Sequence, residues 1–392
     1  MAITPTRIDT EQTKVLTREQ MRQELLALPG GVSRMVWKVG SDPSDPQKVF
    51  DMVVRPEIVE SGYAFWAQFP QAIAGGMNEQ LYYHPELGLV WNGSTISLEQ
   101  GHEELLVTAL QNTDGIDLHP EAAPGWQILL AHAAELSPKI RLLKTHIATP
   151  TCSEAVLGDD LKPLQLDMYR ALMLGHIKKG RMISPRIVVS ADDPNPFDKN
   201  KLISNFEIMF GDRFEYGRLI EAGTDVLRAV HCCGDGDFLG AMATGAVDVV
   251  HWDALKYPDV LRGQPDALEK YLSNGGMLAW GGVPQKMDIM LDLAGELGFD
   301  QHGLDVRSPQ SYIPVAEFLQ RNFYKAVERV YSRYLSWLLK TANESKMDPT
   351  LIAKQVFISA TCGYGANPVS ELRRVSYDLA RAAGDLNYKL AL

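Results

Sequence analysis

The stretch VLRAVHCCGDGDF, residues 226–238, joins an apolar run to a glycine-rich turn and indicates how the chain folds. Residues 226–233 have the composition of a β-strand, in which successive side chains point to opposite faces. His231 and Cys233 therefore share one face of the strand, and Cys232 points to the other. The Gly-Asp-Gly turn that follows places this pair at the carboxyl end of the strand, where barrel enzymes build their active sites.

Similar apolar runs recur along the chain and alternate with longer stretches of helical periodicity. These helical stretches are long enough to carry one strand back parallel to the next. The alternation predicts either a parallel barrel or a doubly wound sheet. The other predicted strands are residues 63–70, 141–150, 186–192, 247–253, 277–284 and 356–362, and the clearest helical stretches are residues 162–179, 202–222 and 316–344.

The beginning of the chain has a different pattern. A helical periodicity over residues 17–28 ends at the Gly-Gly pair 30–31, and residues 40–47 (GSDPSDPQ) are rich in turn residues. We therefore expect residues 1–60 to be an N-terminal extension that packs on the rest of the fold. Residues 61–392 then form the repeated strand-helix domain.

Composition narrows the classes of partner. The chain has 392 residues and a formal net charge of -11, which repels phosphate backbones and anionic membrane surfaces. We expect neither nucleic acid nor a membrane as a partner. No apolar run approaches the length of about 18 residues that a membrane span needs, and the first twenty residues lack the apolar core of a signal peptide. These features predict a soluble, cytoplasmic protein, whose oligomeric state the sequence leaves open.

The four cysteines indicate metal binding or catalysis more than structural disulfide bonds. They stand at positions 152, 232, 233 and 362, which is no secreted disulfide framework, and clustered thiols in a reducing compartment more often bind metal or catalyse. Asp253 and Cys362 end later predicted strands, as Cys233 does. One histidine, two cysteines and a carboxylate suit tetrahedral zinc, and their long spacing is typical of a catalytic site. The alternative is a core histidine beside two buried thiols.

Seven short segments in order resemble the catalytic half of cobalamin-independent methionine synthase. That family belongs to a superfamily with uroporphyrinogen decarboxylase and the coenzyme M transferases. The resemblance covers residues 61–392 and implies a (β/α)8 TIM barrel. The segments are WAQFPQ at 66–71, ATPT at 148–151, ADDP at 191–194, VHCCGD at 230–235, VVHWD at 249–253, AWGGVP at 279–284 and SATCGYG at 359–365.

The resemblance also implies roles for individual residues. The zinc ligands are His231, Cys233, Asp253 and Cys362, although Asp253 stands where the family has a glutamate. The catalytic and substrate-contacting residues that we expect beside them are Asp192, His251, Trp66 and Gln68.

Each of these four roles rests on a different observation. Asp192 matches the aspartate that contacts the substrate amino group in the family, and its alternative role is a helix N-cap before Pro194. His251 shares a strand face with Asp253, so it either orients a ligand, faces the substrate or is a core histidine. Trp66 offers a flat pocket wall or core packing. Gln68 stands in the first-strand segment where the family has Gly-Ser.

These roles lead to a predicted function. Zinc lowers the pKa of an incoming thiol, such as that of homocysteine, and the resulting zinc-bound thiolate accepts a methyl or alkyl group. The donor is a methyl-folate, a methyl-corrinoid protein or an epoxide. The alternatives are a coenzyme M alkyltransferase, a decarboxylase of the uroporphyrinogen type and a zinc-binding barrel without catalysis.

Overall fold

The fold is described from a computed structural model. It covers residues 16–38, 45–66, 68–69, 81–112, 114–193, 226–363 and 367–392.

Eight parallel strands form one sheet, in the order β1-β10-β9-β8-β7-β6-β5-β2. Each strand lies beside its neighbours along the chain, and the first strand pairs with the last. The rings of Trp37 in β1 and Tyr63 in β2 stack 6.2 Å apart, so the two ends of the sheet also approach each other. The sheet is therefore a nearly closed barrel. The strands are β1 (Val36–Trp37), β2 (Tyr63–Phe65), β5 (Leu142–Ala148), β6 (Ile187–Asp193), β7 (Leu227–Cys232), β8 (Val249–Asp253), β9 (Met277–Val283) and β10 (Val356–Ala360).

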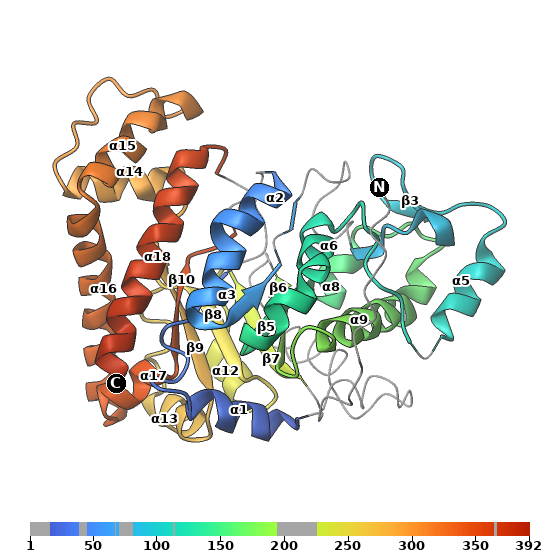
Figure 1. The fold of residues 1–392 in the computed structure, drawn as a ribbon, viewed down its shortest axis with the longest axis horizontal. Coiled ribbons are helices and arrows are strands. Elements are labelled where there is room, and N and C mark those ends of the chain that lie inside the picture. Colours follow the sequence, from blue (N-terminus) through green and yellow to red (C-terminus); the bar gives the residue numbers. More distant parts are fainter. Residues whose placement is uncertain are drawn as a thin grey trace.

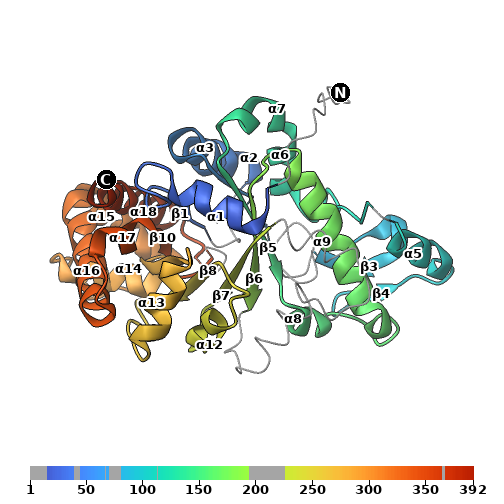
Figure 2. The ribbon, with the colours of Figure 1, turned by 90° about the horizontal axis from the view of Figure 1, so that it is seen from below.

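Helices surround the strands, as Figures 1 and 2 show. This arrangement confirms the predicted (β/α)8 TIM barrel. The helices that connect or cover the strands are α2 (Pro46–Val49), α3 (Arg55–Ser61), α6 (Pro124–Ala131), α7 (Ala133–Leu136), α8 (Pro150–Glu154), α9 (Gln165–Arg181), α12 (Phe238–Ala243), α13 (Pro265–Ser273), α14 (Met287–Glu296), α15 (Ile313–Arg321), α16 (Phe323–Ser345), α17 (Pro349–Lys354) and α18 (Ser370–Ala391).

An insertion between β2 and β5 stands away from the barrel (Figure 1). It contains the antiparallel hairpin of β3 (Leu89–Trp91) and β4 (Ile96–Leu98), followed by α5 (Glu103–Leu110). None of the helices in the described ranges combines the length and the apolar character that a membrane crossing needs.

All seven predicted strands are present, six of them with small shifts of their ends, whereas β2 ends at Phe65, five residues before the end of the predicted strand 63–70. The predicted helical stretch 316–344 is two helices, α15 and α16, which meet at Asn322, and the stretch 202–222 lies outside the described residues. The eighth strand, Val36–Trp37, lies within residues 1–60, so the expected extension supplies a strand of the barrel. Two residues are too few to show strand alternation in a sequence.

The first helix, α1 (Arg18–Leu26), packs against the amino-terminal end of the barrel. Thr17 and Gln20 form a capping box that begins the helix. Arg18 and Arg22 then reach the buried carboxylate of Asp248, with N–O distances of 2.6 and 3.2 Å. The same carboxylate accepts a hydrogen bond from the backbone N–H of Arg228. Asp248 therefore joins α1 to β7 and to the start of β8.

We expect Asp248→Ala to destabilise the fold by about 3–5 kcal/mol, because it leaves two partly buried guanidinium groups without their carboxylate. Urea unfolding of both proteins measures the difference. Glu19→Ala is the control, because it removes an exposed ion pair to Arg22 and should cost less than about 1 kcal/mol. Equal losses in the two variants would contradict the role of Asp248.

Candidate metal centre

Three ligand atoms meet where the strands of the barrel end. They are Nε2 of His231 and the Sγ atoms of Cys233 and Cys362, and all three lie within 4.8 Å of one another. The histidine Nε2 is 3.1 Å from Cys233 Sγ and 3.9 Å from Cys362 Sγ, and the two sulfur atoms are 2.7 Å apart. His231 is the second-to-last residue of β7, and Cys362 follows β10. Strands β8 and β9 therefore lie between them in the sheet.

Strand alternation places these side chains as the sequence predicts. His231 and Cys233 contact each other, whereas Cys232 is fully buried and accepts a hydrogen bond from the backbone N–H of Gly234. The structure thus brings together three of the four predicted ligands. It also confirms that Cys232 takes no part in the cluster.

The donor set fits a metal ion. Neighbouring ligand atoms in a tetrahedral zinc site lie about 3.5–3.8 Å apart, and the three distances here bracket that range. Thiolate sulfur and imidazole nitrogen are ligands that zinc and other borderline-soft ions prefer. The three residues can therefore hold one metal ion.

The two thiols are coupled through a shared proton. The hydrogen bond to Cys362, together with burial and to a smaller extent the charge of Asp192, raises the pKa of the Cys233 thiol. The same hydrogen bond lowers the pKa of Cys362 well below its usual range. The pair therefore holds one proton on Cys233 and reaches the fully deprotonated state that a metal needs only when that proton leaves.

His251 lies directly beside the cluster. Its ring stacks on that of His231 with a centroid separation of 4.4 Å, and its Nε2 donates to the carbonyl oxygen of Ala360 at 3.1 Å. Burial and the charges of His231 and Lys144 hold the pKa of His251 well below its usual range, so the ring is neutral. This arrangement orients the His231 ring. Whether His251 also meets a substrate stays a prediction.

Asp253, the fourth predicted ligand, is not among the clustered residues. Its Oδ1 accepts hydrogen bonds from the backbone N–H groups of Leu255 and Lys256, at 3.1 and 3.0 Å. Burial raises the pKa of this carboxyl group, and the Lys286 ammonium opposes that effect. The turn after β8 thus holds the side chain at the edge of the site.

Asp192 is buried in β6, in register with His231 of β7. Its Oδ1 accepts a hydrogen bond from the Ser190 hydroxyl at 2.6 Å, and its Oδ2 has no hydrogen-bond partner in the described part of the chain. The predicted N-cap role before Pro194 cannot be followed further, because residue 194 lies outside the described residues. The contact between Asp192 and a substrate amino group stays a prediction.

Trp66 and Gln68 line a small cavity of about 20 Å³, together with His146 and His176. The Trp66 ring stacks on His146 at 4.4 Å, and its indole N–H donates to Thr145. A space of this size holds about one water molecule. The metal ligands are not part of its lining, so the predicted substrate roles of Trp66 and Gln68 find no contact with the cluster.

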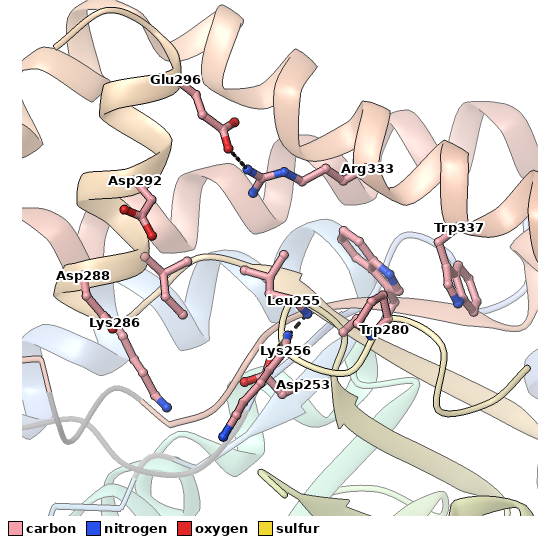
Figure 3. Close-up of a pocket in the computed structure, with 13 residues that line it drawn as sticks. Asp253, Leu255, Lys256, Trp280, Lys286, Asp288, Asp292, Glu296, Arg333 and Trp337 are labelled. Atoms are coloured by element: carbon pink, nitrogen blue, oxygen red, sulfur yellow. Dashed lines mark hydrogen bonds and ion pairs between the residues drawn. The ribbon is translucent and has the colours of Figure 1, made fainter. Parts of the chain in front are cut away.

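Three lysines near the site were not predicted from the sequence. Lys144 is fully buried in β5, its ammonium has no hydrogen-bond partner among the described residues, and burial lowers its pKa. A lysine in the middle of an apolar run is the signal that marks it. Lys256 and Lys286 line a cavity of about 660 Å³ that Asp253 borders (Figure 3).

We expect purified protein to carry about one metal ion per chain. Cys233→Ser and Cys362→Ser should each lose most of it, because two ligands hold an ion far less tightly than three. Elemental analysis after dialysis gives the metal content. Cys232→Ala is the matched control and should keep the metal, and loss of metal in that variant would contradict the observed strand alternation.

Metal affinity should rise with pH. The raised pKa keeps the proton on Cys233 at neutral pH, and an incoming ion must displace it. Lower pH favours the protonated, metal-free state, so the apparent affinity should fall by roughly tenfold per pH unit for each proton displaced. Competition with a chelator at several pH values measures this slope. A flat profile would mean that the thiols are already deprotonated.

No protein-family model matches the chain, and a comparison with curated proteins also finds no match. The function must therefore be argued from the geometry of the site.

Proposed function

We propose that the protein is a zinc-dependent enzyme that transfers a methyl or other alkyl group to a small thiol such as homocysteine. One observation carries the proposal, namely the cluster of His231, Cys233 and Cys362 at the carboxyl end of a parallel barrel. Barrel enzymes place their reacting groups at this end.

The number of ligands supports catalysis over a purely structural role. Structural zinc sites usually have four protein ligands, whereas catalytic sites have three and keep one position open. The described residues supply three ligands here. The carboxylate of Asp253 is not part of the cluster, and its Oδ1 accepts hydrogen bonds from the backbone of its own turn.

The two sulfur ligands favour a thiol as that substrate. A bound zinc ion would lower the pKa of the thiol and keep its sulfur nucleophilic at neutral pH. Cys233 and Cys362 would donate negative charge to the site, and the stacked ring of His251 would fix the orientation of His231.

The transfer itself is a substitution at carbon. The thiol proton leaves first, and the substrate sulfur then attacks the alkyl carbon of the donor. The new bond joins sulfur to carbon, the bond from that carbon to the donor atom breaks, and its electron pair stays on that atom, which is the folate nitrogen, the corrinoid cobalt or the epoxide oxygen. The folate or corrinoid then departs, whereas the epoxide oxygen stays in the product through its second carbon and takes up a proton. The donor is a methyl-folate, a methyl-corrinoid protein or an epoxide.

We expect a small thiol to add one sulfur neighbour at about 2.3 Å to the zinc of the wild-type protein. Binding should also release close to one proton near neutral pH, since a free thiol with a pKa of about 8.5 is mostly protonated there. X-ray absorption at the zinc edge detects the new neighbour, and calorimetry in buffers of different ionisation enthalpy counts the proton.

Cys232→Ala should behave as wild type in both measurements. Asp253→Asn should keep the added sulfur, because the described cluster does not include Asp253. A zinc shell that stays unchanged in saturating homocysteine and 2-mercaptoethanesulfonate would defeat the proposal and favour a barrel that binds zinc without catalysis.

A further inference from the structure

A cavity of about 660 Å³ opens beside the metal centre, between the turn after β8, the start of α14 and the side of α16 (Figure 3). Asp253, the last residue of β8, borders one end of the cavity. A second cavity of about 430 Å³ continues it along α16 and shares Pro258, Glu296, Arg333 and Trp337 with it. Ligand sites for cofactor-sized molecules span about 300–1,000 Å³, so this space exceeds the needs of a small thiol.

Two cations border the end of the cavity near Asp253. Lys256 and Lys286 come from the loops that follow β8 and β9, and Figure 3 shows both side chains extending toward the lower part of the view. Neither ammonium forms an ion pair with a carboxylate in the described ranges of the chain. The Lys256 ammonium instead lies over the ring of Tyr257, 5.2 Å from its centroid.

Four carboxylates also line the cavity, and among the described residues none of them forms an ion pair with either lysine. Glu296 is occupied by Arg329 and Arg333, with N–O distances of 2.6 Å to each. Asp288 and Asp292 are exposed on α14, and Figure 3 shows Asp288 beside Lys286. Asp288 follows Lys286 in the first turn of α14, and Asp253 is the other carboxylate near the lysines, where two backbone N–H groups already donate to its Oδ1.

The start of α14 adds to the positive potential. Lys286 is the N-cap residue of this ten-residue helix, and no side chain caps the free N–H groups of its first turn. Such a terminus favours a negative charge, and Asp288 in the first turn already supplies part of it, so the terminus adds only modestly to the effect of the two lysines. Trp280, Ile289 and Trp337 supply apolar surface farther along the cavity.

We propose that this cavity binds an organic anion of cofactor size, with its negative group at Lys256 and Lys286 and its apolar part against Trp280 and Trp337. The assignment of this anion to a substrate rests on the proposed function. Under that function, the anion belongs either to the thiol acceptor or to the alkyl donor. A carboxylate, sulfonate or phosphate presents the chemistry that the two ammonium groups recognise.

The test uses a matched pair of thiol-free probes, naphthalene-2-sulfonate and the uncharged naphthalene-2-sulfonamide. Their binding to the full-length protein is followed by calorimetry and by quenching of tryptophan fluorescence. We expect the sulfonate to bind at least about tenfold more tightly. Lys256→Met/Lys286→Met should abolish that preference, while Lys270→Met, which removes an exposed lysine of α13 outside the cavity, should keep it.

Equal binding of the two probes would overturn the proposal. So would a preference that survives the double substitution, or one that Lys270→Met reduces as strongly, because the cause would then be the overall charge of the protein. Retained unfolding midpoints in urea establish that each variant is folded.

Two further binding experiments test the cavity independently of the proposed alkyl transfer and identify which substrate carries the anion. In Cys233→Ser, the sulfonate should still bind although metal is lost, so the cavity can stand where thiol chemistry fails. In wild type, 3-mercaptopropionate should compete with the sulfonate if the anion belongs to the thiol. Simultaneous binding of both assigns the anion to the alkyl donor.

Discussion

The backbone hydrogen bonds between parallel strands are the constraint on which the metal centre depends. They hold β7, β8, β9 and β10 in one register, with His231 opposite His251 and Asp253 opposite Gly281. Because all of these strands run in one direction, their carboxyl ends reach the same end of the barrel. Cys233 and Cys362 are 129 positions apart in the chain, yet their sulfur atoms lie 2.7 Å apart. A shift of one residue in any strand would turn its ligand away from the others.

The interior of this barrel is more polar than the apolar layers that usually fill the fold. Lys144, Asp192 and His251 are all buried there, and each has a polar atom without a hydrogen-bond partner among the described residues. Burying such groups is costly unless something compensates for them. The Lys144 ammonium lies over the Trp37 ring, 5.2 Å from its centroid, and Asp192 offsets part of its charge. Polar groups kept at this cost beneath a set of metal ligands favour a functional interior over a purely structural one.

The metal centre and the neighbouring cavity complement each other chemically. The cluster supplies sulfur and imidazole ligands for one ion, and the cavity that Asp253 borders supplies cationic and aromatic groups. Asp253 borders the cavity, the charge of Cys362 acts on its carboxyl group, and the turn that also carries Lys256 holds its Oδ1. A substrate that spans both would place its reacting atom at the cluster and its remaining mass in the cavity.

What the sequence determined by itself is local in origin. Strand alternation depends only on neighbouring residues, so the sequence alone predicted that His231 and Cys233 face away from Cys232. Seven of the strands were predicted from similar local patterns. The (β/α)8 fold was implied by the family resemblance. The tertiary structure decided the rest. The strand at Val36–Trp37 is too short to show a period, and it exists because β10 pairs with it. The backbone N–H groups after β8 hold Asp253 outside the cluster, and Trp66 and Gln68 turn to another cavity. Lys256 and Lys286 line one cavity because the loops after β8 and β9 lie at the same end of the barrel, and no spacing along the chain encodes that arrangement.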